Sequence, residues 1–566
     1  MEDYKGVVLA AASVLVLLVV LSKLKSLLIT KPKLNLPPGP WTLPVIGSLH
    51  HLVTGSSIHS AMRGLAQKHG PVMMLRLGEL QALVVSSPEA AQEVMKTNDI
   101  TFADRYNTTN LGILNINGDV VALMPYGERW RQLRKISVLE LLSVARVLSF
   151  RHIREEEVSR LMGDLAASAG TGAAVNLTKM ISRFLNDTIV RESVGSRCKY
   201  QDEYLDALDT ALRQTSGLAV ADLFPSSKLM QVLGTAPRKV LACRERIERI
   251  LKQIIQEAAE AMDRGDDAVG AGTGSDGFLG VLLRLQKARS TPIPLTDETI
   301  IATLFLMFSA GSETSSTTLN WCMTELIRSP ALMAKAQAEV REAFKGKSTI
   351  TEGDLDGLSY LKLVIKEALR LHTPLPLLIP RKCRDTCKIM GYDIPKGTLV
   401  FVNTWAICRD PKYWDDPEEF KPERFETSSL DYKGTNYEYL PFGAGRRICP
   451  GINLGVRNIE LSLARLIYHF DWKLPNGIEP KDVDLSEAAG ITARKETSLI
   501  LYLITRIPPG DGLSPAPNTY PGAAAASKRA EVTLALRRPF GPCALGAVDT
   551  SEFDKLNVTY ASHMCT

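Results

Sequence analysis

The sequence predicts a mainly α protein of the α+β class, in which a large helical domain with a small β-rich subdomain follows an N-terminal transmembrane helix. Three observations support this prediction. Helical hydrophobic patterns dominate the chain, and short apolar runs bounded by turn residues gather in two places. Residues 6–21 are all apolar or glycine except Ser13. The even composition from about Pro37 to Ile507 indicates one large folded unit.

Composition and charge exclude several classes of protein. With 566 residues, of which 45% are hydrophobic and 23% charged, the chain can bury a large core. A net charge of +5 without a concentrated basic stripe argues against nucleic acid as a partner. Nine cysteines scattered through the chain do not make a disulfide framework. The close pair Cys383 and Cys387 lacks the second Cys or His pair that a zinc site needs.

The N-terminus predicts a membrane anchor in residues 1–35. The apolar run from Gly6 to Leu21 reaches the length of a spanning helix if the lysines that follow it extend to the interface. A cleaved signal peptide is the alternative, but its positive charges precede the apolar run, whereas here they follow it. By the positive-inside rule the rest of the chain stays cytosolic, which agrees with unpaired thiols. We expect a single-pass protein in contact with membrane lipid.

The first elements after the anchor are a proline hinge and a hairpin. Residues 36–44 contain Leu36-Pro37-Pro38-Gly39-Pro40, which cannot continue a helix and predicts a stiff connection. Two apolar runs, Val72–Leu77 and Gln81–Ser86, flank Gly78-Glu79 and predict a β-hairpin. Ser87 followed by Pro88 predicts the start of a helix.

The remaining elements are mostly helical. Patterns predict helices at Asp297 to about Arg328 and at Tyr360–Leu371, and a second strand-rich patch at Tyr392–Asn403. Residues 265–277 have the composition of a solvent-exposed loop, and residues 508–566 that of a disordered extension. The domain prediction is therefore an anchor at 1–35, a hinge at 36–44, a catalytic domain at 45–507 and a C-terminal extension.

The strongest chemical signal is a glycine-rich segment around one cysteine. It reads Phe442-Gly443-Ala444-Gly445-Arg446-Arg447-Ile448-Cys449-Pro450-Gly451. Glycines let a loop close tightly over a planar ligand, and backbone N–H groups can then point at the sulfur. A thiolate ligand pushes electron density onto haem iron and favours cleavage of the O–O bond. The segment predicts Cys449 as an iron ligand and Arg447 as a donor to a haem propionate.

At these residues the sequence resembles the cytochrome P450 family, and four further segments support the resemblance. Ala310-Gly311-Ser312-Glu313-Thr314-Ser315 is similar to the family's oxygen-binding motif on its long central helix. Glu367-Ala368-Leu369-Arg370 and Pro422-Glu423-Arg424-Phe425 resemble its Glu-x-x-Arg pair and the downstream partner of that pair. Trp130-Arg131-Gln132-Leu133-Arg134 matches its Trp-x-x-x-Arg segment. Order and spacing agree up to about Ile507.

The resemblance implies a cytochrome P450 fold, a haem b cofactor and a role for each matched residue. Cys449 is implied as the metal ligand. Glu367, Arg370 and Arg424 are implied to form a buried structural network that supports the cysteine loop, although as a surface pair they would contribute little. The residues implied to bind the cofactor are Trp130, Arg134, Ala310, Gly311, Arg381, Pro441, Phe442, Gly443, Arg447, Cys449 and Gly451.

The oxygen motif also has a physical interpretation of its own. A glycine followed by polar residues inside an apolar helix is costly unless the helix opens there, so we expect a local bulge that leaves room for O₂. We expect Thr314 to hold dioxygen or its water by a hydrogen bond and Glu313 to relay protons, so these two are the predicted catalytic residues. Without Cys449, an ordinary polar turn facing solvent would explain the same residues.

The predicted function is NADPH- and O₂-dependent oxidation of a small apolar molecule. Three regions that line the family's substrate cavity, Tyr106–Asp119, Leu304–Ser309 and Thr373–Ile379, are rich in apolar residues, although a buried core gives the same pattern. Similarity is greatest to plant endoplasmic-reticulum members that oxidise terpenoids and other specialised metabolites. Such enzymes receive electrons from an NADPH-dependent reductase, and a basic docking face for it is predicted at Arg131, Lys135, Arg446 and Arg457.

Two other functions remain open at this point. A haem-thiolate isomerase or dehydratase would need neither O₂ nor a reductase, but such relatives typically lack the pair that Glu313 and Thr314 provide. A non-catalytic membrane haem sensor would have no use for an oxygen-activating pair or an apolar cavity. Turnover without NADPH would indicate the first function, and failure to consume NADPH with any substrate would indicate the second.

Overall fold

The computed structural model describes residues 34–53, 57–197, 199–215, 220–227, 236–263 and 277–510. The predicted membrane helix, most of the predicted loop at 265–277 and the extension from residue 511 onward lie outside the described residues. Within them, no helix combines the length and the apolar character that crossing a bilayer requires.

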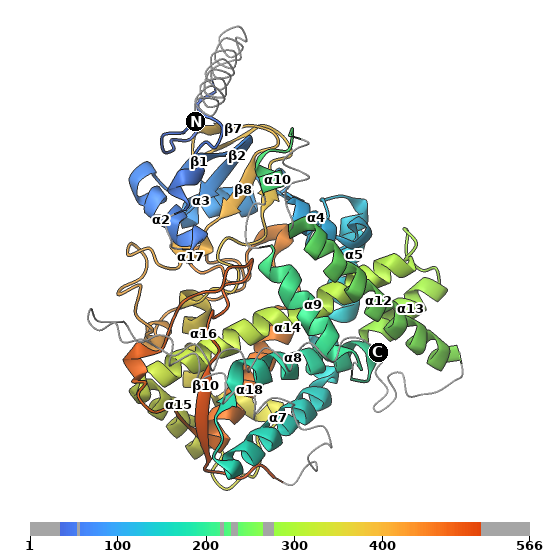
Figure 1. Cartoon of the computed structure of the whole chain (residues 1–566), viewed down its shortest axis with the longest axis vertical. Helices are drawn as coiled ribbons and strands as arrows, with labels where there is room; N and C mark the ends of the chain where they lie inside the picture. The colour runs from blue at the N-terminus through green and yellow to red at the C-terminus, as the bar shows by residue number, and fades with distance from the viewer. Residues whose placement is uncertain are drawn as a thin grey trace, which may run out of the picture. The chain divides into compact units, whose positions relative to one another are not determined.

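Helices are the main regular structure of the described chain (Figure 1), as the sequence predicts. They are α2 (Ile58–His69), α3 (Pro88–Gln92), α4 (Thr109–Leu114), α5 (Glu128–Ile136), α6 (Val144–Ser149), α7 (Arg151–Thr171), α8 (Leu177–Val194), α9 (Gln201–Arg213), α10 (Val220–Leu223), α12 (Ala236–Asp263), α13 (Phe278–Lys287), α14 (Asp297–Arg328), α15 (Pro330–Ala343), α16 (Ser359–Leu371), α17 (Thr404–Ile407) and α18 (Ile452–His469).

The strands make three small sheets. They are β1 (Val72–Leu77), β2 (Leu80–Val85), β3 (Asp104–Arg105), β4 (Val175–Asn176), β5 (Arg381–Lys382), β6 (Cys387–Ile389), β7 (Tyr392–Ile394), β8 (Leu399–Val402), β9 (Phe470–Lys473) and β10 (Ile500–Thr505). The largest sheet has the order β1-β2-β8-β5-β3, in which β2 and β8 are parallel and the other pairs antiparallel. The second has the order β4-β10-β9, and β6 pairs with β7 alone.

Local sequence signals correctly predict several elements. The hairpin around Gly78 is β1 and β2, with Leu77 opposite Leu80. Ser87 caps α3, since its hydroxyl accepts a hydrogen bond from the Ala90 N–H at 3.3 Å. The boundaries of α14 are those predicted. The strand patch at Tyr392–Asn403 is present but divides at Pro395–Gly397, so that β7 and β8 belong to different sheets.

Alternation of side chains places both faces of the large sheet in apolar surroundings. Leu83, Val85 and Val400 lie on one face, in a cluster with residues of α3 and with Leu440 and Ala444 of the cysteine loop. Val84 and Leu399 lie on the other face, in a cluster with α2. The cysteine loop therefore packs against one face of this sheet.

The helical part is built around α14, which runs between α8, α16 and α18 (Figure 1). Its N-terminal half belongs to the largest apolar cluster, together with residues of α4, α5, α9, α12 and α13. The approach to α18 is close, because a Cβ atom on Gly455 would lie 3.6 Å from the Ser315 Oγ. Since α18 begins just after Cys449, this contact brings the cysteine loop near the middle of α14.

Candidate active site

The cysteine loop is closed by backbone hydrogen bonds. The Cys449 N–H donates to the Phe442 carbonyl at 3.0 Å, and the Ile448 N–H donates to the Gly445 carbonyl at 3.0 Å within a short 3₁₀ turn, η7 (Gly445–Arg447). Pro441 is buried and Phe442 half-buried. These bonds hold the cysteine at a defined place just before the N-terminus of α18.

Two glycines allow the loop to take this path. Gly443 and Gly445 have φ angles of 68° and 69°, in the left-handed region that favours glycine. A Cβ on Gly445 would lie 2.1 Å from the Met95 carbonyl oxygen, so no larger residue fits there without movement of the backbone. Leu378, next to Gly443, also has a positive φ of 53°, which is a strained conformation for a bulky residue.

The Cys449 side chain is half-buried, whereas Cys322 and Cys408 are fully buried. Burial in the protein interior raises the pKa of the Cys449 thiol, while the Gly451 N–H and the Arg134 guanidinium lower it by favouring the thiolate. The N-terminus of α18 adds a partial positive charge on the same side. The surroundings of the sulfur thus contain groups that stabilise an anionic ligand.

Four arginines gather beside the cysteine loop, and three of them are predicted cofactor-binding residues. Burial and mutual repulsion lower the pKa of Arg447 to about 9, and burial lowers that of Arg381 to about 10. Burial also lowers the pKa of Arg134, whose guanidinium donates to the Ile448 carbonyl at 2.5 Å. The fourth is Arg105, whose pKa is lowered by burial and by repulsion from the other three.

Sequence reasoning missed Arg105, because no motif surrounds it. The strand pairing of β3 with β5 sets Arg105 opposite Arg381. Its guanidinium donates to the carbonyls of Ala122 at 2.9 Å and Ile379 at 2.7 Å. Arg105 could have been identified as the basic residue opposite Arg381 across a short strand pair. This signal is visible only once the pairing of β3 with β5 is known.

Trp130 and Arg447 share an acceptor. The indole N–H of Trp130 and the guanidinium of Arg447 both donate to the Val121 carbonyl, at 3.2 and 3.1 Å, and the guanidinium carbon lies 4.5 Å from the ring centroid. Arg447 further donates to Ala103 and Met124. In the structure the N–H groups of Trp130 and Arg447 therefore donate to backbone carbonyls.

The donor set fits a haem group. A half-buried thiol at a helix N-terminus would supply a sulfur ligand to its iron. Beside it lies an excess of buried positive charge, since the nearest carboxylate to Arg381 is that of Asp99 at 3.8 Å. The buried Nε of Arg381 has no hydrogen-bond partner among the described residues. Two propionates would neutralise such a cluster.

The oxygen motif lies on an uninterrupted helix, so the expected local bulge is wrong. The whole span Asp297–Arg328 is regular α-helix. The hydroxyls of Ser312 and Thr314 donate to the carbonyls four residues earlier, those of Phe308 at 2.5 Å and Ala310 at 2.8 Å. Because these bonds satisfy the hydroxyls along the helix itself, the polar side chains do not force it open.

The same turn is the accessible part of α14. Ala310 is exposed and Gly311 and Thr314 are half-buried, although most of the helix on either side is fully buried. Accessible small residues in the middle of a buried helix indicate an internal space next to that turn.

The side chain of Glu313 contacts a distant segment of the chain, at Thr492 and Arg494. Its Oε1 accepts a hydrogen bond from the Thr492 hydroxyl at 3.0 Å and lies 3.6 Å from Arg494, which in turn pairs with Asp209 of α9 at 2.6 Å. Burial raises the pKa of Glu313, and Arg494 opposes that rise. Thr492 and Arg494 lie about 180 residues further along the chain, where no motif identified them.

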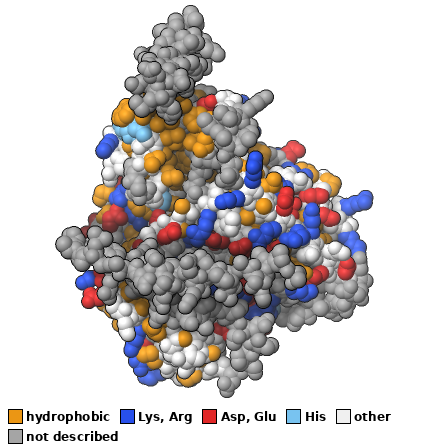
Figure 2. Space-filling view, in the orientation of Figure 1, with side chains coloured by type: hydrophobic (Ala, Val, Ile, Leu, Met, Phe, Trp, Pro, Cys, Tyr) orange, Lys and Arg blue, Asp and Glu red, His pale blue; other side chains and the backbone are white. Residues whose placement is uncertain are grey.

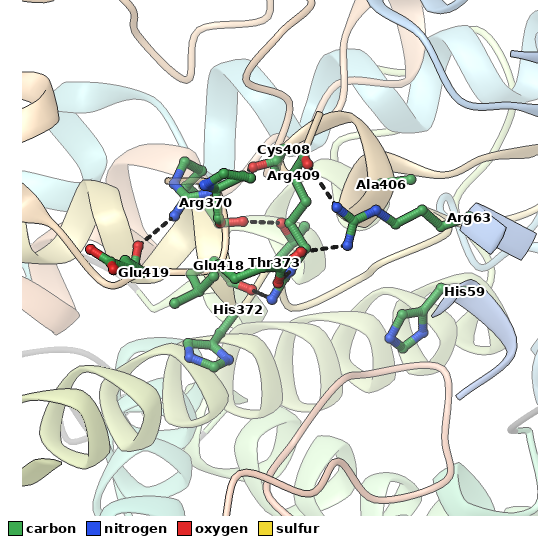
Figure 3. A network of polar contacts seen from close by, with 12 residues as sticks. His59, Arg63, Arg370, His372, Thr373, Ala406, Cys408, Arg409, Glu418 and Glu419 are labelled. Atoms are coloured by element: carbon green, nitrogen blue, oxygen red, sulfur yellow. Dashed lines mark hydrogen bonds and ion pairs between the residues drawn. The ribbon is translucent and has the colours of Figure 1, made fainter. Parts of the chain in front are cut away.

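The structure brings Glu367, Arg370 and Arg424 together. Both carboxylate oxygens of Glu367 accept hydrogen bonds from Arg370 at 2.8 Å, and Oε1 also accepts from Arg424 at 2.9 Å. Arg370 donates further to the carbonyls of Cys408 and Glu419 (Figure 3). These bonds tie α16 to the segment 408–424, which leads into the cysteine loop.

Two of the three predicted cavity regions meet at α14. Leu111 and Leu114 of α4 share an apolar cluster with Leu304 and Phe305, and Ile379 packs against it. Leu377 and Leu378, in contrast, pack against the two clusters on the faces of the large sheet. The third region thus contributes Ile379 to this cluster, while Leu377 and Leu378 pack against the large sheet.

Comparisons with known proteins agree with this site. The family model described as cytochrome P450 matches residues 37–501. The chain is 66% identical to dolabradiene monooxygenase of Zea mays over 90% of its length and 99% of that protein. It is 58% identical to ent-cassadiene hydroxylase of Oryza sativa subsp. japonica over 90% and 99% of the two chains.

A solved structure agrees as well. A zebra fish cytochrome P450, in a structure with abiraterone, superimposes with a TM-score of 0.64 at 25% identity, covering 79% of this chain and 99% of that one. A cysteine loop against the central helix, a matching family model and relatives named as monooxygenases and hydroxylases support one conclusion. The chain belongs to the cytochrome P450 family of haem-thiolate monooxygenases.

Proposed function

We propose that the protein is an NADPH- and O₂-dependent monooxygenase that oxidises a small neutral terpenoid hydrocarbon. The observation that supports this most strongly is the accessible turn Ala310–Thr314 in an otherwise buried α14, near the Cys449 loop and beside an apolar cluster. The bound haem would supply dioxygen activation, helped by its sulfur ligand.

The apolar cluster beside the accessible turn favours an uncharged substrate. The side chains that α4 and the part of α14 ahead of the oxygen motif give to it include Leu111, Leu114, Leu304, Phe305 and Phe308, and none of these carries a charge that could hold an ionised group. The names of the two plant relatives each state a diene as the compound acted upon. A hydrocarbon diene of terpenoid type is accordingly the substrate class we propose.

The protein's own side chains have three tasks in the proposed reaction. Arg105, Arg134, Arg381 and Arg447 would hold the propionates, and the Trp130 ring packs against the Arg447 guanidinium. Thr314 keeps a hydroxyl at the accessible turn, where it orients dioxygen or water. Glu313 holds a proton more readily than an exposed carboxyl does, because burial raises its pKa. To pass that proton toward the turn, its side chain would have to leave Thr492 and Arg494.

We further propose a reductase that docks on a basic face. Arg131, Arg384 and Arg446 converge on Tyr126, with guanidinium carbons 5.7, 5.6 and 5.8 Å from its ring centroid. Lys135 is exposed on the same helix as Arg131, and Arg457 is half-exposed. A face of this kind near the Cys449 loop attracts an acidic electron donor.

The proposed location is the endoplasmic-reticulum membrane, with the catalytic domain in the cytosol. Beyond the apolar run in residues 6–21, exposed apolar side chains continue on the first described residues, where Trp41 is 64% and Val45 57% exposed. Figure 2 shows hydrophobic side chains gathered at the upper end of the molecule in that view. Such a surface suits contact with lipid.

The experiment is turnover in a reconstituted membrane preparation with an NADPH-dependent reductase and a panel of terpenoids, phenylpropanoids and fatty acids. We expect a terpenoid hydrocarbon to gain one oxygen atom from ¹⁸O₂ with matched NADPH consumption. Cys449→Ser should abolish the reduced carbon monoxide difference spectrum, whereas Thr314→Ala should keep that spectrum and release more hydrogen peroxide. Product formed without NADPH, or no NADPH consumption with any compound, would contradict the proposal.

A further inference from the structure

Cys383 and Cys387 form a thiol pair outside the haem site. The Cys383 Sγ donates to the Asp385 carbonyl at 3.0 Å, and the two thiols are close enough for each to shift the pKa of the other. The Cys383 Sγ lies 4.0 Å from the Ile394 carbonyl oxygen, and Cys387 is the cross-strand partner of Ile394 in the β6–β7 hairpin. Both cysteines thus lie beside Ile394 and are only four residues apart, so a disulfide between them would close a short ring.

The two thiols differ in access. Cys387 is half-buried and Cys383 is fully buried in the apolar cluster on one face of the large sheet. The neighbouring Cys383 thiol lowers the pKa of Cys387, whereas the Cys387 thiol and burial raise the pKa of Cys383. Access and thiolate character therefore coincide at Cys387, as they do in cysteines that react with peroxides.

The other described cysteines outside the haem site offer no such arrangement. Cys243, Cys322 and Cys408 are buried, and burial raises the pKa of each thiol. Cys449 is the proposed iron ligand. Among the residues that the structure describes, a neighbouring thiol pair with one accessible member is thus found only at Cys383, just after β5, and Cys387, the first residue of β6.

We propose that Cys383 and Cys387 are a redox-active pair that hydrogen peroxide oxidises to a disulfide. The Cys387 sulfur attacks one peroxide oxygen, the O–O bond breaks, and a sulfenic acid and water form. The Cys383 sulfur then attacks the Cys387 sulfur, the S–O bond breaks, and a second water leaves with the Cys383 proton. In total the two thiols lose two electrons and two protons, and one peroxide becomes two waters.

The position of the pair gives this oxidation a structural consequence. The β6–β7 hairpin is a separate two-stranded sheet, whereas Cys383 directly follows β5 of the large sheet. A disulfide would join the two covalently, two residues after Arg381 of the arginine cluster. The ring spans five residues, so it adds little stability by restricting the unfolded chain, which suits a reversible bond.

The test uses the purified full chain, reduced and then treated with increasing hydrogen peroxide, alkylated and digested with trypsin. Cleavage after Lys382, Arg384 and Lys388 separates the two cysteines, so the disulfide appears as the linked peptides Cys383–Arg384 and Asp385–Lys388, which dithiothreitol separates. We expect Cys387 to lose alkylation at least about tenfold faster than buried Cys243. Because peroxide is added, the result does not depend on whether the proposed function is correct.

Variants identify the order of attack. In Cys383→Ser, a dimedone adduct should accumulate on Cys387, since its sulfenic acid has no partner, and in Cys387→Ser the Cys383 thiol should remain alkylatable. Oxidation of the exposed Met390 shows that the peroxide dose was sufficient. The proposal is overturned if both thiols stay alkylatable once Met390 is oxidised, or if the disulfides that form join separate chains.

Discussion

At the scale of single residues, the contacts of the buried arginine cluster are those of an anion-binding site and differ from those of arginines buried in structural ion pairs. Arginines buried for structure alone usually meet carboxylates, as Arg370 meets Glu367. Arg105, Arg134, Arg381 and Arg447 instead repel one another, and their donors reach mainly backbone carbonyls. An assembly of this kind is stable when it holds an anionic ligand.

Replacing Arg105 tests its assignment to that ligand. Arg105→Met removes one charge-assisted donor, worth about 2 kcal/mol, so we expect haem to leave on the order of thirtyfold faster. The measurement is transfer of haem to excess apomyoglobin, followed by the Soret band. Arg131→Met, at a position 54% exposed and outside the cluster, is the control. Equal rates in the two variants would show that Arg105 does not hold the cofactor.

At the scale of elements, the cysteine loop depends on contacts that its own sequence does not contain. Gly445 passes against the Met95 carbonyl oxygen, and the Arg446 N–H donates to Asp99. Behind the loop, the Glu367 network anchors the segment 408–424 through bonds to carbonyls. Both sets of contacts hold Cys449 in place from outside the motif.

Comparing Gly445→Ala with Gly397→Ala separates the cost of steric crowding from the cost of backbone strain. Gly397 has φ of +88° with open space around its missing side chain, whereas Gly445 has φ of +69° and a carbonyl oxygen 2.1 Å from a built Cβ. Gly397→Ala should therefore cost only the left-handed conformation, about 1–2 kcal/mol. Gly445→Ala should cost about 4 kcal/mol or more, because the backbone must move. Urea unfolding measures both, and equal losses would contradict the crowding.

Glu367→Gln tests the buried network. The substitution leaves Arg370 and Arg424 without their carboxylate in a fully buried place, so we expect a loss of about 3–5 kcal/mol in unfolding free energy. Glu419→Gln is the matched control, since that side chain is exposed and the network uses only its carbonyl. Thermal denaturation of both variants compares them. A loss in Glu367→Gln no larger than in Glu419→Gln would rule out an anchoring role.

At the scale of the whole molecule, the packing of α18 against β9 and the segment that follows β10 makes the fold sensitive to acid. His469, the last residue of α18, is 1% exposed, and its Nδ1 lies 2.8 Å from the Ile507 carbonyl oxygen. Burial lowers the pKa of His469 to about 4 from 6.5. The folded state therefore binds the proton less readily than the unfolded state does.

The sign of the pH effect follows from that difference. A depressed folded-state pKa contributes stability that is fully present above about pH 6.5 and is lost as the pH falls through about 4. His469→Asn keeps a donor to Ile507 and does not titrate. We expect the advantage of wild type over the variant to shrink by about 3 kcal/mol between these pH values. Denaturant unfolding at several pH values measures it, and a constant difference would contradict it.

The sequence by itself determined those features that depend on short segments of neighbouring residues. The prediction that Cys449 is the iron ligand follows from ten adjacent residues, the bounds of α14 from its own hydrophobic pattern, and the β1–β2 hairpin from the turn between its strands. Capping, turn geometry and periodicity act between neighbours in the chain and are visible there.

Only the tertiary structure decided which distant residues meet. Arg105 joins the cluster because β3 pairs with β5 across the sheet, and Glu313 turns to Thr492 and Arg494 because the segment near the end of the fold packs on α14. The helix stayed closed at Thr314, against expectation, because its hydroxyl bonds the helix itself. Such contacts depend on packing between segments hundreds of residues apart, which no local pattern records.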